Sequence, residues 1–171
     1  MITLRPQGGL QIKKELEIAR LRDFSNLLNF DALPGTFREK IMAVEDQLNL
    51  LPYTEYKMTH QFNGGVYLRT LYAPKNTLMT SYIYKKDHHN LISKGVVSYR
   101  SEVLGGKITG PCSFQAGAGS KRVVFFHTDC VWTTIIATDA TNVKDAEKDI
   151  YLRTYEEWDK ECRANIIEVG G

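Results

Sequence analysis

The distribution of apolar and polar residues divides the chain into three zones, and the first is helical. From Gln11 to Phe30 apolar side chains recur near helical spacing, and Leu33 to Gly35 end that pattern. Thr36 and Glu39 then form a capping-box sequence, in which each side chain can accept the backbone N–H of the other residue. The two segments predict a helical arm of roughly 40 residues.

One face of the second predicted helix is apolar, and Pro52 follows its end. A stripe of this kind has to pack against something. It can dock the arm on an identical subunit or on another protein, where specificity comes from anchors at i, i+3, i+4 and i+7. Alternatively, it can cover one face of the β-barrel that the middle zone of the same chain is expected to form. The expected interface residues are Phe37, Ile41, Val44, Leu48 and Leu51.

The middle zone, from Met58 to about Thr138, has the rhythm of strands. Short runs rich in Val, Ile, Thr, Tyr and Phe alternate with Gly, Pro and Asn. These runs are GGVYLRTLY, NTLMTSYIYK, KGVVSYRSEV, KITGPCSF, KRVVFFH and VWTTIIAT. Strands that recur at near-regular spacing between turn signals predict an antiparallel sandwich or barrel.

The last zone returns to helical spacing in NVKDAEKDIYLRTYEEWDKECRAN. Asn142 is the expected N-cap, and Asp145 lies in the first turn, where an acidic side chain favours the helix dipole. The expected inward-facing residues are Val143, Ala146, Ile150 and Tyr155. The predicted organisation is a helical arm over 1–57, a barrel over 58–140, and a C-terminal helix packed on the barrel over 141–171.

Composition and charge narrow the classes of protein. The chain has 171 residues, of which 43% are hydrophobic and 25% charged, a balance typical of a folded domain. The formal net charge is +2 and the basic residues are scattered, so nucleic-acid binding is not expected. No apolar run approaches the roughly 20 residues needed to span a bilayer. Cys112, Cys130 and Cys162 lack zinc-finger spacing and are expected to be free thiols.

The barrel zone resembles the first motif of the cupin double-stranded β-helix. That motif is G, five residues, HxH, three or four residues, E, six residues and G. Aligned on Gly95, this chain has Tyr82 and Tyr84 at the two histidine positions and His88 at the glutamate position.

The second cupin motif is G, five residues, PxG, two residues, H, three residues and N. Aligned on Gly119, it places Arg122 at the histidine position and Phe126 at the asparagine position. The family's three histidines and glutamate bind one metal in the barrel mouth. The resemblance therefore implies the cupin fold with its metal ligands mostly replaced.

A closer resemblance is to cupin-type proteins encoded by tailed bacteriophages. It covers His60 to Glu157 and rests on THQFNGGVYLR, KKDHHNLISKG, GPCSFQAGAGSKRVVFFHTD and VWTTIIATDAT, which occur in the family's order. Three departures concern the family's polar positions: Tyr84 replaces its first histidine, Asp87 its glutamate and Ile136 its last histidine. The resemblance implies fold and source more than activity.

The segment YIYKKDHHNLISKG contains the candidate metal ligands. If it continues one strand, Tyr82, Tyr84 and His88 share a face and His89 points the other way. His127 could approach His88 across the barrel mouth and, with Asp87 or Tyr84, supply ligands for Zn, Fe or Mn.

Two observations oppose this metal site. Tyrosine is a reluctant ligand at neutral pH, and the fixed cation of Arg122 would repel a dication. We therefore expect no cofactor, with a divalent metal as the alternative. His88 and His127 are then hydrogen-bonding barrel or surface residues.

The same region holds the candidate ligand-binding residues Tyr82, Tyr84 and Arg122. Tyrosines near the mouth can line a small-molecule pocket, although aromatic strand residues more often only pack. Arg122 is suited to recognise a carboxylate or a phosphate.

Two functions remain open. The first is a non-catalytic phage protein, an adaptor, tail or decoration component of the virion that forms homo-oligomers or binds other virion proteins through its arm. The alternative is a metal-dependent cupin enzyme or a small-ligand-binding protein expressed during infection. The expected location is the virion, or the host cytoplasm during infection, with no membrane partner.

Overall fold

Helix α2 (Phe37–Leu48) begins where the capping box predicts. The Thr36 backbone N–H donates to Glu39 Oε2 over 2.7 Å, and the Glu39 N–H donates to Thr36 Oγ1 over 3.3 Å.

The computed structural model describes residues 30–51 and 53–169, with the backbone alone for 165–169. A short 3-10 helix, η1 (Phe30–Ala32), precedes α2. The other residues of the predicted helix from Gln11 lie outside the described part.

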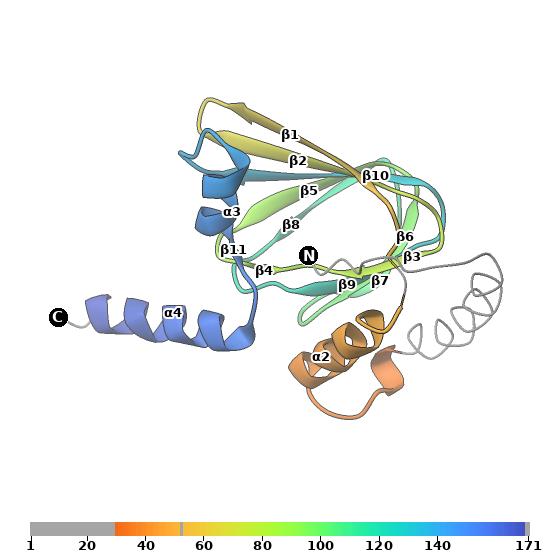
Figure 1. Ribbon diagram of the computed structural model, residues 1–171, viewed down its shortest axis with the longest axis horizontal. Coiled ribbons are helices and arrows are strands. Elements are labelled where there is room, and N and C mark those ends of the chain that lie inside the picture. Colours follow the sequence, from red (N-terminus) through yellow and green to blue (C-terminus); the bar gives the residue numbers. More distant parts are fainter. Residues whose placement is uncertain (1–29, 52, 170–171) are drawn as a thin grey trace.

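Nine of the eleven strands in the described part of the chain form two antiparallel sheets that face each other (Figure 1). The larger sheet has the order β1-β2-β10-β5-β8 and the smaller has β3-β9-β6-β7. The bounds in the first sheet are β1 (Lys57–Asn63), β2 (Val66–Ala73), β5 (His88–Lys94), β8 (Cys112–Ala116) and β10 (Cys130–Ala137). Those in the second are β3 (Thr77–Thr80), β6 (Val96–Ser101), β7 (Gly105–Thr109) and β9 (Arg122–Phe126).

The chain passes between the two sheets from β2 to β3, from β3 through β4 (Ile83–Tyr84) to β5, from β5 to β6, from β7 to β8, from β8 to β9 and from β9 to β10. This pattern of two interlocked Greek keys is that of the jelly roll, to which cupins belong. The prediction of a mainly β, cupin-like jelly roll with a helix before it and a C-terminal helix is confirmed. Strands β1 and β5 were not among the predicted runs.

Sequence alternation sets which side chains enter the barrel. In β2 the residues Tyr67, Arg69, Leu71 and Ala73 are buried, and their neighbours are more exposed. The tight turn before β2 uses Gly64 and Gly65, both at positive φ, a conformation that glycine adopts without steric cost. The main core inside the barrel comprises Leu71, Ala73, Met79, Ile92, Val97, Tyr99, Val124, Phe126, Cys130 and Trp132.

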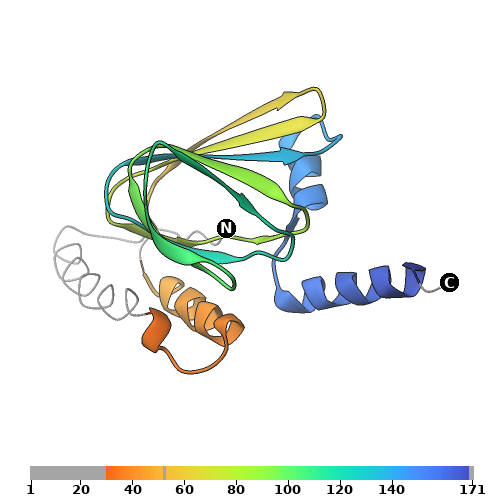
Figure 2. The ribbon, with the colours of Figure 1, turned by 180° about the vertical axis from the view of Figure 1, so that it is seen from behind.

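Helix α2 lies outside the barrel, beside the smaller sheet (Figures 1 and 2). Ile41, Val44 and Leu48 are at most 7% exposed and pack in one cluster with Ile83 and Val123. The half-buried Phe37 and Leu51 pack against the same cluster. The apolar stripe of α2 therefore packs on the chain's own barrel. This is the alternative to docking on another subunit or protein.

The C-terminal zone is not the single helix that the sequence predicts. It forms α3 (Val143–Ile150), the two-residue strand β11 (Tyr151–Leu152) and α4 (Tyr155–Val169). Asn142 caps α3 as expected. The break occurs because Tyr151 and Leu152 pair with strand β4 (Ile83–Tyr84).

Helix α4 then begins with a capping box of its own. The Glu157 N–H donates to Thr154 Oγ1 over 3.2 Å, and the Thr154 N–H donates to Glu157 Oε2 over 3.3 Å. The helix extends away from the barrel toward the C-terminus (Figures 1 and 2). No helix in the described part of the chain is long and apolar enough to cross a membrane.

Candidate functional site

Arg122, the first residue of β9, projects its side chain into the barrel and is only 4% exposed. Its Nη1 donates to Asn90 Oδ1 over 3.0 Å, and its Nη2 donates to His88 Nε2 over 2.6 Å. The guanidinium carbon lies 5.2 Å from the ring centroid of Tyr84 and 5.6 Å from that of Trp132. Arg122 is therefore at the centre of a polar and aromatic cluster inside the barrel.

The contacts of His88 fix its tautomer. A guanidinium can only donate, so Nε2 of His88 must be the unprotonated acceptor. Nδ1 then carries the proton and donates to the Lys86 carbonyl over 3.1 Å. Burial, together with the charge of Arg122, lowers the pKa of His88 to about 4. The ring is neutral near pH 7, and both of its nitrogens are engaged.

Asn90 is an uncharged residue on which three hydrogen bonds of the cluster converge. Its Oδ1 accepts from Arg122 Nη1, from Trp132 Nε1 over 2.9 Å and, more weakly, from Thr134 Oγ1 over 3.4 Å. These three donors fix the orientation of the amide. The side chain is fully buried, and its Nδ2 has no hydrogen-bond acceptor among the described residues. A buried N–H group of this kind is costly unless an acceptor reaches it.

A second buried cation, Arg69, is 8% exposed and lies on β2 of the larger sheet, as does Asn90 on β5, whereas Arg122 belongs to the smaller sheet. Arg69, Thr134 and Asn90 are successive partners across β2, β10 and β5, so the Cα atoms of Arg69 and Asn90 are about 10 Å apart. Arg69 Nη1 donates to Tyr151 Oη over 3.1 Å, and its Nε contacts Met58 Sδ. The barrel interior thus carries two guanidinium groups.

Tyr84 lies between the two cations. Its ring stacks on His88 with centroids 3.8 Å apart and meets Tyr151 edge-on at 4.9 Å. Burial opposes ionisation of the phenol, but the charges of Arg122 and Arg69 outweigh it and hold the pKa of Tyr84 below its ordinary value. The electrostatic field inside the barrel therefore favours negative charge.

A cavity of about 50 Å³ opens beside this cluster. One water needs at least about 10–15 Å³ by the same measure, so the cavity holds only a few non-hydrogen atoms. The polar lining comes from Arg69, Thr80, Ser81, Tyr84, Arg122 and Thr134. The apolar lining comes from Met58, Leu71, Met79, Val124, Phe126 and Trp132.

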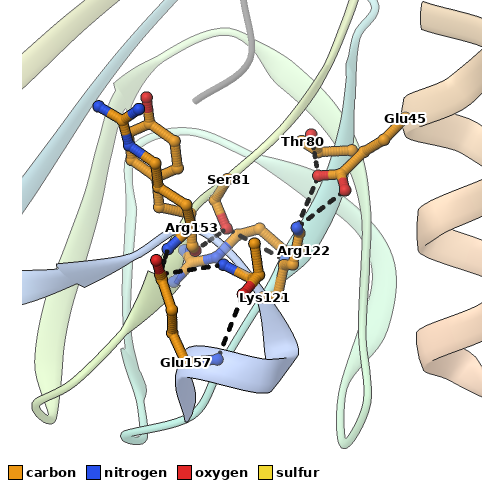
Figure 3. Close-up of polar contacts among 9 residues, drawn as sticks. Glu45, Thr80, Ser81, Lys121, Arg122, Arg153 and Glu157 are labelled. Carbon is orange, nitrogen blue, oxygen red and sulfur yellow. Dashed lines mark hydrogen bonds and ion pairs between the residues drawn. The ribbon is translucent and has the colours of Figure 1, made fainter.

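No carboxylate among the described residues forms an ion pair with Arg122. Its neighbour Lys121 differs, because it reaches Glu45 of α2 over 2.7 Å at 3% exposure (Figure 3). Thr80 Oγ1 also donates to Glu45 Oε1 over 2.8 Å. The Lys121–Glu45 ion pair and the Thr80 hydrogen bond attach α2 to the rim of the cavity. In the described part of the chain, Arg122 has only neutral side-chain partners.

The structure does not bring the predicted metal ligands together. His127 lies just past β9 with Phe125, on the outer face of the smaller sheet, and its Nε2 contacts Ser98 Oγ at 2.7 Å. Asp87 Oδ1 accepts the Ala118 N–H over 2.8 Å. The idea that His127 approaches His88 across the mouth is therefore wrong, because alternate residues of β9 point to opposite faces.

The donor set also does not fit a metal. No group of three or more His, Cys, Asp or Glu side chains converges in the described part of the chain. His88 has both ring nitrogens in hydrogen bonds, and one of them faces the cation of Arg122. A dication there would meet a fixed positive charge instead of carboxylates.

Of the three predicted ligand-binding residues, Tyr84 and Arg122 meet in the barrel. Tyr82 precedes β4 and does not line the cavity, and it packs on Tyr151 with centroids 5.7 Å apart. The sequence reading missed Arg69 and Asn90. Strand parity could have found them, since Arg69 shares a face with the buried Tyr67, and Asn90 shares one with His88.

Comparison with known proteins finds only distant likenesses. No family model matches the chain. No curated protein matches it either.

Solved structures that resemble it include a cupin superfamily protein from Desulfitobacterium hafniense, with 10% identity, 50% of this chain and 80% of that chain covered, and a TM-score of 0.44. A cupin family protein with a double-stranded β-helix fold from Methanocaldococcus jannaschii has 13% identity, coverage of 49% and 81%, and a TM-score of 0.42. An acetylacetone dioxygenase from Acinetobacter johnsonii has 15% identity, coverage of 48% and 58%, and a TM-score of 0.40. Likenesses this distant say nothing about the activity of this chain, and the fold class rests on its own strand order.

Proposed function

We propose that this jelly-roll protein is a non-catalytic binding protein that holds a small anion inside its barrel. The observation that carries the proposal is Arg122, a 4% exposed cation at the cavity with no carboxylate partner among the described residues. Buried charges in proteins are normally paired, because an isolated one is expensive. A bound anion would supply the missing partner.

Two further features support this function. Two uncharged atoms, Asn90 Oδ1 and His88 Nε2, hold the Arg122 guanidinium in place without neutralising its charge, and neither residue lines the cavity itself. Arg69 adds a second positive charge to the cavity wall. Together with Arg122 it would favour an anionic ligand over a neutral one of equal size.

Ligand binding can be tested with a panel of small anions that contains chloride, phosphate, sulfate and short carboxylates. A ligand that binds only the folded state raises the melting temperature in a concentration-dependent way. We expect at least one anion to do so for the natural protein and to lose the effect in Arg122→Met.

The matched control is Arg153→Met, which removes the same charge from an exposed position. It should respond to the anion as the natural protein does. If no anion stabilises the protein, or if both variants lose the response equally, the proposed site is not an anion site.

A biological setting is suggested separately by the resemblance to tailed-phage proteins. We propose that the protein is an accessory or structural component of a phage particle, assembled with copies of itself or with other virion proteins. The support is the ordered run of motifs from His60 to Glu157. Because Ile41, Val44 and Leu48 pack on the barrel, assembly would have to use other surfaces.

Mass spectrometry of purified particles tests this setting. Peptides of the protein at a fixed ratio to the major capsid protein are the expected result. Their presence only in lysates of infected cells would contradict the structural role, and anion binding would be unaffected by either outcome.

A further inference from the structure

The polar and apolar lining residues of the cavity lie at different levels along the strands, because Arg69 pairs with Thr134 whereas Leu71 pairs with Trp132. The apolar wall of the cavity is formed by residues of the barrel's main core, namely Leu71, Met79, Val124, Phe126 and Trp132. The indole N–H of Trp132 is already donated to Asn90. A ligand atom on this side therefore meets carbon and sulfur, with no free donor among these residues.

The hydroxyl groups at the polar side are already engaged. Ser81 Oγ donates to the Tyr82 carbonyl over 2.9 Å and accepts the Arg122 backbone N–H over 3.1 Å (Figure 3). Thr80 donates to Glu45, as described above. The Arg122 guanidinium has five N–H groups in all, and its side-chain bonds go to Asn90 and His88, so it can still donate to a ligand in the cavity that it lines.

These constraints distinguish between classes of anion. Phosphate and sulfate carry oxygens on all sides, so some of them would face the apolar wall without a donor, which is unfavourable. A carboxylate has both oxygens at one end, where a guanidinium binds them in a planar, bidentate geometry. Its alkyl carbons can then lie on the apolar side.

From this separation we infer that the ligand is a short-chain aliphatic monocarboxylate, with its carboxylate on Arg122 and its alkyl chain against Met79, Val124 and Phe126. The inference rests on the proposed anion-binding function and narrows it to one ligand class. The volume of about 50 Å³ limits the chain to a few carbons.

Calorimetric titration of the natural protein with acetate, propionate, butyrate, phosphate and sulfate tests the ligand class. Each methylene that enters the apolar side should tighten binding about fourfold until the cavity is full. Propionate or butyrate should therefore bind more tightly than acetate, and all three should bind more tightly than phosphate and sulfate.

Two variants locate the bound molecule. Arg122→Met should weaken carboxylate binding about tenfold or more, whereas Arg153→Met should leave it unchanged. Val124→Thr places a hydroxyl on the apolar wall at nearly constant volume, and should weaken butyrate more than acetate. Melting curves of each variant establish that it is folded.

The outcomes separate this inference from the proposed function. Phosphate or sulfate as the tightest ligand, lost in Arg122→Met, would leave the anion site standing and overturn the carboxylate assignment. Butyrate that binds equally well to Arg122→Met would overturn the placement. Absence of binding by every anion would overturn both proposals.

Discussion

Lys121 and Arg122 are adjacent in sequence and almost equally buried, at 3% and 4% exposure, but they lie in opposite surroundings. Lys121 faces α2 and ion-pairs with Glu45, which also accepts from Thr80. Arg122 faces the barrel interior, where its side chain meets Asn90, His88 and aromatic rings.

Lys121 and Arg122 illustrate two different reasons why a protein buries a cation. A buried ion pair such as that of Lys121 holds elements together, and its loss leaves a charge without a partner. A buried cation with only neutral partners contributes little to stability, so its presence points to a ligand. The four predictions below test whether the two residues really differ in this way.

The largest loss of stability is expected for Lys121→Met, because this change leaves the buried Glu45 carboxylate without its cation. The free energy of unfolding should fall by about 3–5 kcal/mol, measured by urea denaturation with tryptophan fluorescence. The control is the double variant Lys121→Met with Glu45→Leu, which removes both charges and should recover most of the loss. A double variant as unstable as the sum of the single ones would show that the pair is not coupled.

Acidification should destabilise the protein through His88. Its pKa is about 4 in the folded state, against 6.5 for the ordinary side chain. Below pH 6.5 the unfolded chain binds a proton that the folded protein does not. Stability is therefore complete above pH 6.5 and falls as the pH drops toward 4, by about 2 kcal/mol at pH 4.5.

His88→Gln isolates this contribution. Urea denaturation at pH 7 and pH 4.5 should show a smaller pH-dependent loss for the variant than for the natural protein, by that same amount. Equal losses in the two proteins would mean that burial and the charge of Arg122 do not keep His88 neutral.

Thr80→Val tests the residue that contacts both regions, because Thr80 lines the cavity and donates to Glu45. Loss of a hydrogen bond to a charged acceptor should lower the free energy of unfolding by about 1.5 kcal/mol. Since the hydroxyl is engaged by Glu45, anion affinity should change little. A large loss of affinity with unchanged stability would instead assign Thr80 to the ligand.

The smallest effect on stability is expected for Arg122→Met. It removes two hydrogen bonds but also a desolvated charge, so the free energy of unfolding should change by no more than about 1 kcal/mol. Urea denaturation without added anions gives the measurement. A loss comparable to that of Lys121→Met would show that Arg122 is structural, and the contrast between the neighbours would disappear.

Local signals in the sequence predicted several elements of this structure. The Thr36–Glu39 capping box located the start of α2, the strand-like runs predicted an antiparallel sandwich or barrel, and the resemblance to cupins narrowed this to the jelly roll. A second S/T-x-x-E signal, Thr154–Glu157, marked the start of α4 but was read through as continuous helix. These features were readable because each depends on residues within one turn or one strand.

The candidate site was only partly predictable. Tyr84 and Arg122 were selected as ligand-binding residues and do meet, whereas His127 was placed on the wrong face and Arg69 and Asn90 were not selected. Arg122 and Asn90 are 32 positions apart, and Arg69 and Tyr151 are 82 positions apart. Strand parity gives the face of each residue but not its neighbours across the sheet.

By itself, the sequence determined the helix starts, the alternation of the strands and the turn at Gly64 and Gly65, because short-range sterics and hydrogen bonding decide these. Only the tertiary structure decided that, within the described part of the chain, Lys121 meets a carboxylate and Arg122 does not. The reason is that a strand sends adjacent side chains to opposite faces, and the partner on each face comes from a distant part of the chain.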